Sequence, residues 1–89
     1  MNYHFPRVKF AGLNELGEQL KHVCSEANEA EIAYQHADIN HLALELCDVI
    51  HSAETAMRIL EENYGVDVEK AKDSVRKKNE ARGYYKGAG

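Results

Sequence analysis

Apolar residues recur every three or four positions along most of the chain, which is the spacing of one face of an α-helix. One such stretch runs from about Leu13 to Tyr34, a second from about Leu42 to Tyr64, and a third from about Val68 to Ala81. A break at residues 35–40 separates the first two stretches. The alternation of apolar and polar residues that marks a strand is missing, so we predict an all-α fold with three main helices.

Capping residues stand at the ends of these stretches. Asp38 and Asn40 are both suitable N-caps for the second helix, and Asp67 can cap the third. Gly65 and Gly83 suit the left-handed position that follows the end of a helix. These residues predict where the second helix ends and where the third begins and ends.

The helical pattern leaves residues 1–12 outside it. This segment shows no sustained period, and we expect it to form an N-terminal arm that packs onto another surface and is not a helix or strand of its own. Two long helices joined by a short break should run antiparallel, and each apolar stripe is wider than one partner helix can cover. We therefore predict a single domain over residues 1–89, an antiparallel helical bundle completed by oligomerisation as a homodimer or homotetramer.

The composition is that of a small globular protein. Its 89 residues are 44% hydrophobic, which argues against disorder, and no apolar run approaches the roughly 20 residues needed to span a bilayer. The N-terminus lacks the apolar stretch of a secretory signal, so we expect a cytoplasmic protein without a membrane partner. Cys24 and Cys47 have neither the number nor the spacing for a disulfide framework or a zinc site, and we interpret both as reduced.

Charge is unevenly distributed along the chain, whose net charge is −4. Residues 14–62 hold eleven acidic side chains against two basic ones, whereas residues 70–86 hold seven basic side chains against two acidic ones. The overall negative charge argues against nucleic-acid binding. Two interpretations remain, namely solvated helix faces that happen to segregate, or an acidic metal site combined with a basic phosphate site.

Four carboxylates fall into two pairs with the same spacing. Glu26 and Glu29 are three residues apart in the first helix, and Glu45 and Asp48 repeat this spacing in the second. Residues three apart lie on the same side of a helix, so antiparallel packing could bring both pairs to the edge of one groove. A hard divalent cation such as Mg²⁺ or Mn²⁺ would relieve the repulsion among them. The alternative is an ordinary solvated acidic face.

The apolar stripe of the third helix gives way to polar and basic residues toward the end of the helix. Lys78, Asn79 and Arg82 continue the line that begins at Val68. Lys78 and Arg82 are four residues apart and can grip one polyphosphate, because a guanidinium offers two parallel donors to phosphate oxygens. Alternatively, these cations only complement the helix dipole.

The motif Glu26-x-x-Glu29, fifteen intervening residues and then Glu45-x-x-Asp48 resembles the ExxE…ExxD signature of the MazG-like all-α nucleoside triphosphate pyrophosphohydrolases. The resemblance covers residues 13–86, and its three blocks occur in the order found in small bacterial and phage members: Ser25–Ala30, Leu44–Ile50 and Lys77–Tyr85. One departure is Ser25, where many relatives carry a further glutamate.

The resemblance implies a metal-dependent enzyme that hydrolyses an NTP or dNTP between the α- and β-phosphates. Its products would be a nucleoside monophosphate and pyrophosphate. The implied cofactor is Mg²⁺, with Mn²⁺ as a substitute, and the implied ligands are four carboxylates: Glu26, Glu29, Glu45 and Asp48. Glu29 or Glu26 would act as the general base, and the family pattern favours Glu29.

Substrate contacts complete the hypothesis. Lys78 and Arg82 would neutralise the departing pyrophosphate, and Asn79 would hold the ribose or a phosphate oxygen. Gln19 and His22 lie on the same side of the first helix as the acidic pair and could border a base pocket. An exposed helix histidine without a special role is the alternative for His22.

Two other functions fit part of the pattern. A di-iron bundle uses Glu-x-x-His pairs, and Asp48-x-x-His51 offers only an imitation of one. The chief alternative is a non-enzymatic helical interaction or regulatory module whose acidic face is merely solvated.

Overall fold

The computed structural model describes residues 2–9 and 15–85 of the 89-residue chain. These residues form three helices and no strand: α1 (Leu16–Gln35), α2 (Ile39–Tyr64) and α3 (Val68–Ala81). The all-α fold class is therefore confirmed for the part of the chain that the structure describes. No helix in that part is long and apolar enough to cross a membrane.

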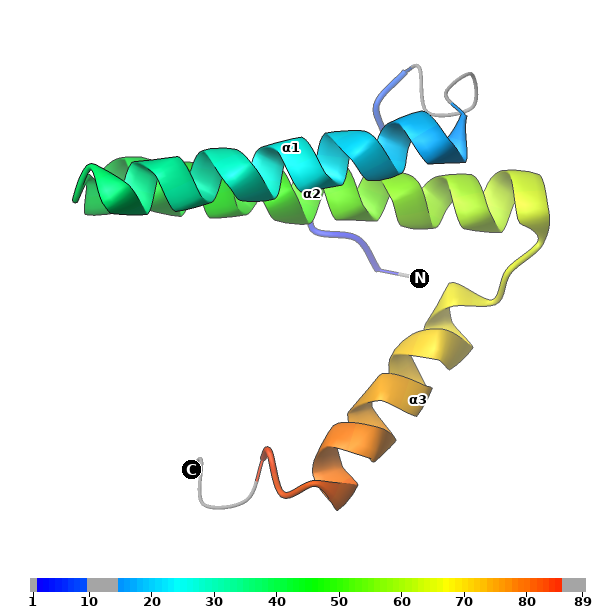
Figure 1. Cartoon of the computed structure of the whole chain (residues 1–89). Helices are drawn as coiled ribbons and strands as arrows, with labels where there is room; N and C mark the ends of the chain where they lie inside the picture. Colours follow the sequence, from blue (N-terminus) through cyan, green and yellow to red (C-terminus); the bar gives the residue numbers. More distant parts are fainter. Residues whose placement is uncertain (1, 10–14, 86–89) are drawn as a thin grey trace.

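The first two helices form an antiparallel hairpin and lie side by side (Figure 1). The turn between them includes Ala37, which has a φ of 57°. Asp38 caps α2, because its carboxylate accepts a hydrogen bond from the backbone nitrogen of His41 at 3.0 Å. Of the two predicted N-caps, Asp38 is the one used, and Asn40 lies inside the helix.

The remaining helix ends follow the capping residues. Gly65 adopts a φ of 65° where α2 ends, and Gly83 adopts 78° just after α3. The carboxylate of Asp67 accepts a hydrogen bond from the backbone nitrogen of Lys70 at 2.9 Å and so caps α3. These three predictions are confirmed, whereas the predicted helix start at Leu13 lies outside the described residues.

The hydrophobic core of one chain is small. Its buried apolar residues are mostly alanines: Ala30, Ala33, Ala56, Ile59 and Val68. Larger apolar side chains on α2 stay in water, including Leu44 at 65% exposure and Leu46 at 49%. The single chain therefore leaves much of the predicted apolar stripe uncovered.

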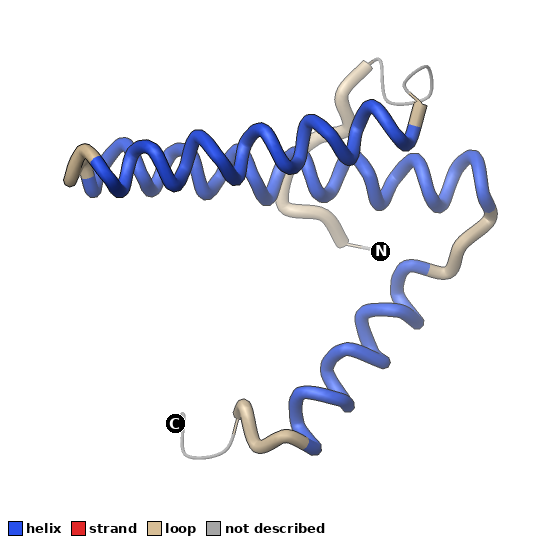
Figure 2. The backbone as a smooth tube through the Cα atoms, in the orientation of Figure 1, coloured by secondary structure: helices blue, strands red, loops and turns tan. Residues whose placement is uncertain are grey.

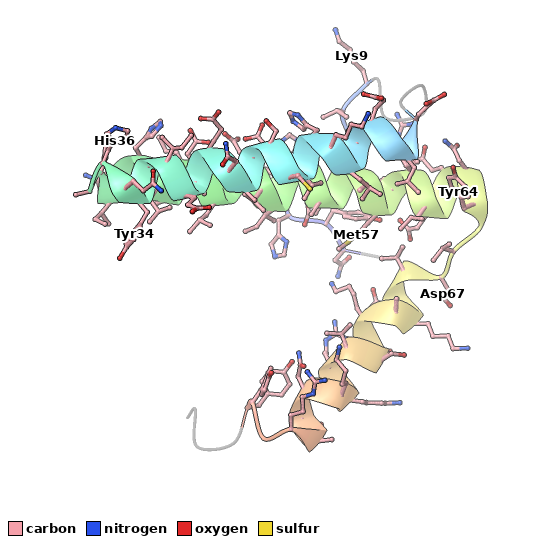
Figure 3. All side chains as sticks on the ribbon, viewed as in Figure 1. Lys9, Tyr34, His36, Met57, Tyr64 and Asp67 are labelled. Atoms are coloured by element: carbon pink, nitrogen blue, oxygen red, sulfur yellow. The ribbon has the colours of Figure 1, made fainter. Side chains whose placement is uncertain are left out.

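The third helix projects away from the hairpin. It starts at the C-terminal end of α2 and runs back at an angle, so that the chain has an open shape (Figure 2). Its contacts with α2 are sparse, and it makes none with α1. Met57 of α2 points toward the open side that faces α3 (Figure 3).

The described part of the N-terminal arm crosses the hairpin and attaches to α2 (Figure 1). The carboxylate of Glu54 accepts hydrogen bonds from the backbone nitrogens of His4 at 2.8 Å and Phe5 at 2.9 Å. Nδ1 of His4 lies 2.7 Å from the same carboxylate. Arg58 donates to the carbonyl oxygen of Phe5 at 2.6 Å, and its guanidinium stands 4.1 Å from the centre of the Tyr3 ring.

These contacts set the charge state of Glu54, which is only 5% exposed. Burial raises the pKa of this carboxyl, but the hydrogen bonds from His4 and Phe5 outweigh burial and hold the pKa below its ordinary value. The carboxylate is therefore ionised at neutral pH. A buried negative charge thus ties the arm to α2.

Candidate metal centre and adjacent cavity

Three carboxylates from the hairpin meet at one place. Glu26 lies on α1, Glu45 and Asp48 lie on α2, and one oxygen from each lies within 4.8 Å of the others. Glu26 and Glu45 are partly buried, and Asp48 is exposed. We call these three residues the acidic cluster.

The helix geometry explains why the cluster forms. Residues three apart share one side of a helix, so Glu45 and Asp48 face the same way, and the antiparallel partner presents Glu26 beside them. Two unit charges about 4.8 Å apart repel by roughly 3 to 4 kcal/mol at an effective dielectric constant of about 20. A divalent cation would convert this repulsion into attraction, and carboxylate oxygens are the ligands that Mg²⁺ and Mn²⁺ prefer.

Each partly buried acid has a histidine one turn before it. Nε2 of His22 lies 3.2 Å from Oε1 of Glu26, and Nε2 of His41 lies 3.0 Å from Oε1 of Glu45. A polar group this close to a carboxylate helps to orient it, and metal-binding carboxylates commonly have such neighbours. His41 was not predicted as part of the site, although its spacing of four residues from Glu45 is a usable signal.

Glu29 takes a different position from the other predicted ligands. It lies one turn beyond Glu26 on α1 and is exposed. Four carboxylates were predicted at one groove, and the structure brings three of them within 4.8 Å of one another.

A cavity of about 120 Å³ opens beside the acidic cluster. Glu26 and Asp48 form its acidic side, and Gln19, Ser52 and Thr55 contribute neutral polar groups. Gln19 is buried, and its amide nitrogen donates to the carbonyl oxygen of Ser52 at 3.0 Å and to Oγ of Ser52 at 3.1 Å. This pair joins α1 to α2 at the cavity.

The rest of the lining comes from two histidines and the arm. His22 lines the cavity together with Gln19, so the two residues predicted to border a base pocket share one site. His51 and Val8 complete the lining. The ring of His51 stacks on Phe5, with ring centres 4.8 Å apart and an angle of 20° between the planes. Nε2 of His51 is buried and has no hydrogen-bond partner among the described residues.

The predicted phosphate-binding residues lie elsewhere in the chain. Lys78 and Asn79 belong to the last turn of α3, and Arg82 follows it. The C-terminal end of α3 stands clear of the hairpin (Figure 2), and α3 makes no contact with α1 and few with α2. These residues therefore lie away from the acidic cluster of their own chain. Lys78 and Arg82 are exposed, and the guanidinium of Arg82 lies 5.9 Å from the centre of the Tyr84 ring.

Comparison with known protein families shows a match over most of the chain. The family model described as the MazG nucleotide pyrophosphohydrolase domain matches residues 14–84. These residues include all three helices and the whole acidic cluster. Neither the curated proteins nor the solved structures yielded a match.

Proposed function

The chain belongs to the MazG nucleotide pyrophosphohydrolase family, and we propose that it hydrolyses a ribo- or deoxyribonucleoside triphosphate between the α- and β-phosphates. The products are a nucleoside monophosphate and pyrophosphate. The observation that supports this reaction most strongly is the acidic cluster beside a cavity with neutral polar lining. A cation at the cluster suits the phosphates, and the cavity suits the uncharged part of a nucleotide.

We propose that the cluster binds Mg²⁺, for which Mn²⁺ can substitute. Glu26, Glu45 and Asp48 supply three oxygen ligands, whereas Glu29, the fourth predicted ligand, lies outside this cluster. A bound cation of this kind polarises a phosphoryl oxygen and lowers the pKa of a water molecule. The carboxylates hold the cation, while the paired histidines hold two of the carboxylates.

Glu29 is the proposed general base. Its carboxylate is exposed and is not held among the three clustered acids, so it is available to take a proton from the attacking water. Glu26 is the alternative base, although its carboxylate already pairs with His22.

We propose that the phosphate contacts come from a second copy of the chain. Lys78, Asn79 and Arg82 lie away from the acidic cluster of their own chain, and α3 is held to its own hairpin by few contacts. Opposite charges attract the basic end of one chain to the acidic hairpin of another. In a dimer, α3 of one copy would therefore bring its cations to the β- and γ-phosphates bound at the other.

The open side between α2 and α3 supports the same assembly. An apolar groove of about 420 Å³ lies there, lined by residues such as Met57, Leu60 and Val75. Leu46 and Ile50, about half exposed, extend the apolar surface along α2. We propose that a second copy covers this surface in a homodimer, or in a homotetramer built from dimers. Nucleoside triphosphates occur in the cytoplasm, where we place the protein.

The identity of the leaving group tests the proposed reaction. The protein is incubated with Mg²⁺ and a panel of ribo- and deoxyribonucleoside triphosphates. Attack at the α-phosphorus releases intact pyrophosphate, so colorimetric phosphate should appear only after inorganic pyrophosphatase is added, and chromatography should show a monophosphate. A diphosphate product with free phosphate would contradict attack at this position. No turnover with either Mg²⁺ or Mn²⁺ would contradict the reaction itself.

A further inference from the structure

The N-terminal arm forms part of the cavity wall. Val8 lines the cavity directly, and Phe5 stacks on the ring of His51, which lines it from α2. The arm thus reaches a site whose other walls come from the hairpin.

Two α2 residues fix the arm at Phe5. Glu54 accepts a hydrogen bond from its backbone nitrogen at 2.9 Å, and Arg58 donates to its carbonyl oxygen at 2.6 Å. The backbone nitrogen and the carbonyl oxygen of Phe5 are therefore both hydrogen-bonded to side chains of α2. This arrangement holds the aromatic ring of Phe5 against His51.

The cavity suits an uncharged heterocycle better than a phosphate. Among the described residues, its lining contains no lysine or arginine, and two of its members are the acids Glu26 and Asp48. Side-chain oxygens and an amide provide neutral hydrogen-bonding groups, while the arm adds an aliphatic surface at Val8. Nucleobase sites typically combine these two kinds of lining.

His51 carries a hydrogen-bonding atom that the described residues do not use. Its Nε2 is buried without a partner, although buried polar atoms in folded proteins are normally paired. The ring belongs to the cavity lining, but Nε2 itself is closed to solvent while the cavity is empty, so the ring must turn slightly for a bound ligand to become its partner.

We propose that His51 recognises the nucleobase, with Nε2 as its hydrogen-bonding atom and with Phe5 holding the ring in place. Glu54 and Arg58 are positioning residues, because they act on the base only through Phe5. This inference rests on the proposed function, since it takes the phosphates to lie at the acidic cluster.

The test separates contact with the base from contact with the phosphates. Isothermal titration calorimetry measures two affinities for each variant: that for the common nucleoside monophosphates without metal, and that for inorganic tripolyphosphate with Mg²⁺. His51→Phe keeps a ring to stack on Phe5 and removes the nitrogen. It should weaken the best-bound monophosphate about tenfold and leave the tripolyphosphate affinity unchanged.

Variants of the arm provide the matched controls. Phe5→Ala should weaken monophosphate binding, and Phe5→Tyr, which keeps the ring, should restore it. Arg7 lies in the same arm, and its guanidinium is 2.8 Å from the exposed carboxylate of Glu62 on α2. Arg7→Ala removes this ion pair and should change neither affinity. Melting temperatures show that each variant is folded.

Three outcomes would overturn the inference. These are an equal loss of both affinities in His51→Phe, no loss of monophosphate affinity in that variant, and a wild-type protein that binds none of the monophosphates. A wild-type protein that binds monophosphates but releases no pyrophosphate would instead contradict the proposed reaction, and the base contact would stand.

Discussion

A carboxylate oxygen of Glu26 lies within 4.8 Å of a carboxylate oxygen of Asp48, although the two residues belong to different helices of the hairpin, α1 and α2. With Glu45 they place three like charges together. The folded protein without a cation therefore contains a repulsion among these carboxylates. In the unfolded chain Glu26 is no longer held near the other two, and the repulsion is lost.

Cation binding should stabilise the folded state. A ligand that binds only the folded protein adds about 2.7 kcal/mol of stability at a free concentration 100 times its Kd. We expect Mg²⁺ and Mn²⁺ to raise the melting temperature in a saturable way, and Na⁺ at the same ionic strength to have little effect. Equal shifts with all three salts would indicate general screening of a solvated acidic face.

Glu45→Gln should abolish metal-dependent turnover and leave the helical fold intact. The substitution keeps the shape of the side chain and removes one anionic ligand, so we expect a loss of more than about 100-fold in kcat/KM. Without metal, the variant should melt at or above the wild-type temperature, because one like charge is gone. Glu31→Gln, at an exposed position on α1 outside the cluster, is the matched control. Wild-type turnover in the Glu45 variant would remove this residue from the site.

Lys78→Ala and Arg82→Ala should weaken triphosphate binding more than monophosphate binding. Each removes charge-assisted hydrogen bonds to the outer phosphates, worth about 1.5 to 3 kcal/mol. Because the contacts are proposed to come from a second copy, mixing Glu45→Gln with Lys78→Ala should give more activity than either variant alone, since one site of the mixed dimer then has an intact cluster and an intact lysine. A mixture that is no more active than either variant, although the two variants exchange subunits, would argue for contacts within one chain.

The chain should sediment as a dimer or tetramer at micromolar concentration. A 10.0 kDa monomer leaves the apolar groove and the exposed face of α2 in water. Val75→Glu would place a charge in this groove and should shift the sedimentation toward monomer. A stable wild-type monomer with full activity would contradict the proposed assembly.

Glu54→Gln should destabilise the protein at neutral pH. The wild-type carboxylate is buried and accepts hydrogen bonds from His4 and Phe5, so loss of its charge should lower the free energy of unfolding by about 1.5 to 3 kcal/mol at pH 7. Chemical denaturation measures this difference.

The same comparison has a defined dependence on pH. The pKa of Glu54 in the folded state lies below its ordinary value, which is about 4.3 in an unfolded chain. As the pH falls, the unfolded state therefore takes up this proton first, and unfolding becomes more favourable. The stabilisation is complete above the unfolded pKa and disappears as the pH falls through the folded pKa. The two proteins should thus converge in stability in acid, and a constant difference would contradict the assigned role of this carboxylate.

Local signals account for what the sequence predicted well. Apolar periodicity and helix capping depend only on residues that are close together in the sequence. The helix limits could therefore be derived from the apolar pattern and from the caps Asp38, Asp67 and Gly65. The acidic cluster was predictable because two short spacings and one hairpin suffice to bring Glu26 and Glu45 together.

Contacts over long sequence distances explain what the sequence did not reveal. The bond between Glu54 and His4 joins residues 50 positions apart and leaves no periodic trace, so Glu54 looked like one more helix acid. The orientation of α3 relative to the hairpin depends on the short connection at residues 65–67 and on which surface packs against the apolar side of α3. The positions of Lys78 and Arg82 relative to the cluster therefore could not be derived from one chain.

The attachment of the arm also has a consequence for the order of folding. The hairpin closes through a short turn, whereas an arm that docked before the hairpin formed would have to close a loop of about 50 residues, at a larger entropic cost. We therefore expect the arm to dock after the hairpin has formed and to detach before the hairpin opens. In native-state hydrogen exchange, the amide of Phe5 should lose protection at a lower opening free energy than amides in the middle of α2. The cavity can thus open to a nucleotide while both long helices remain folded.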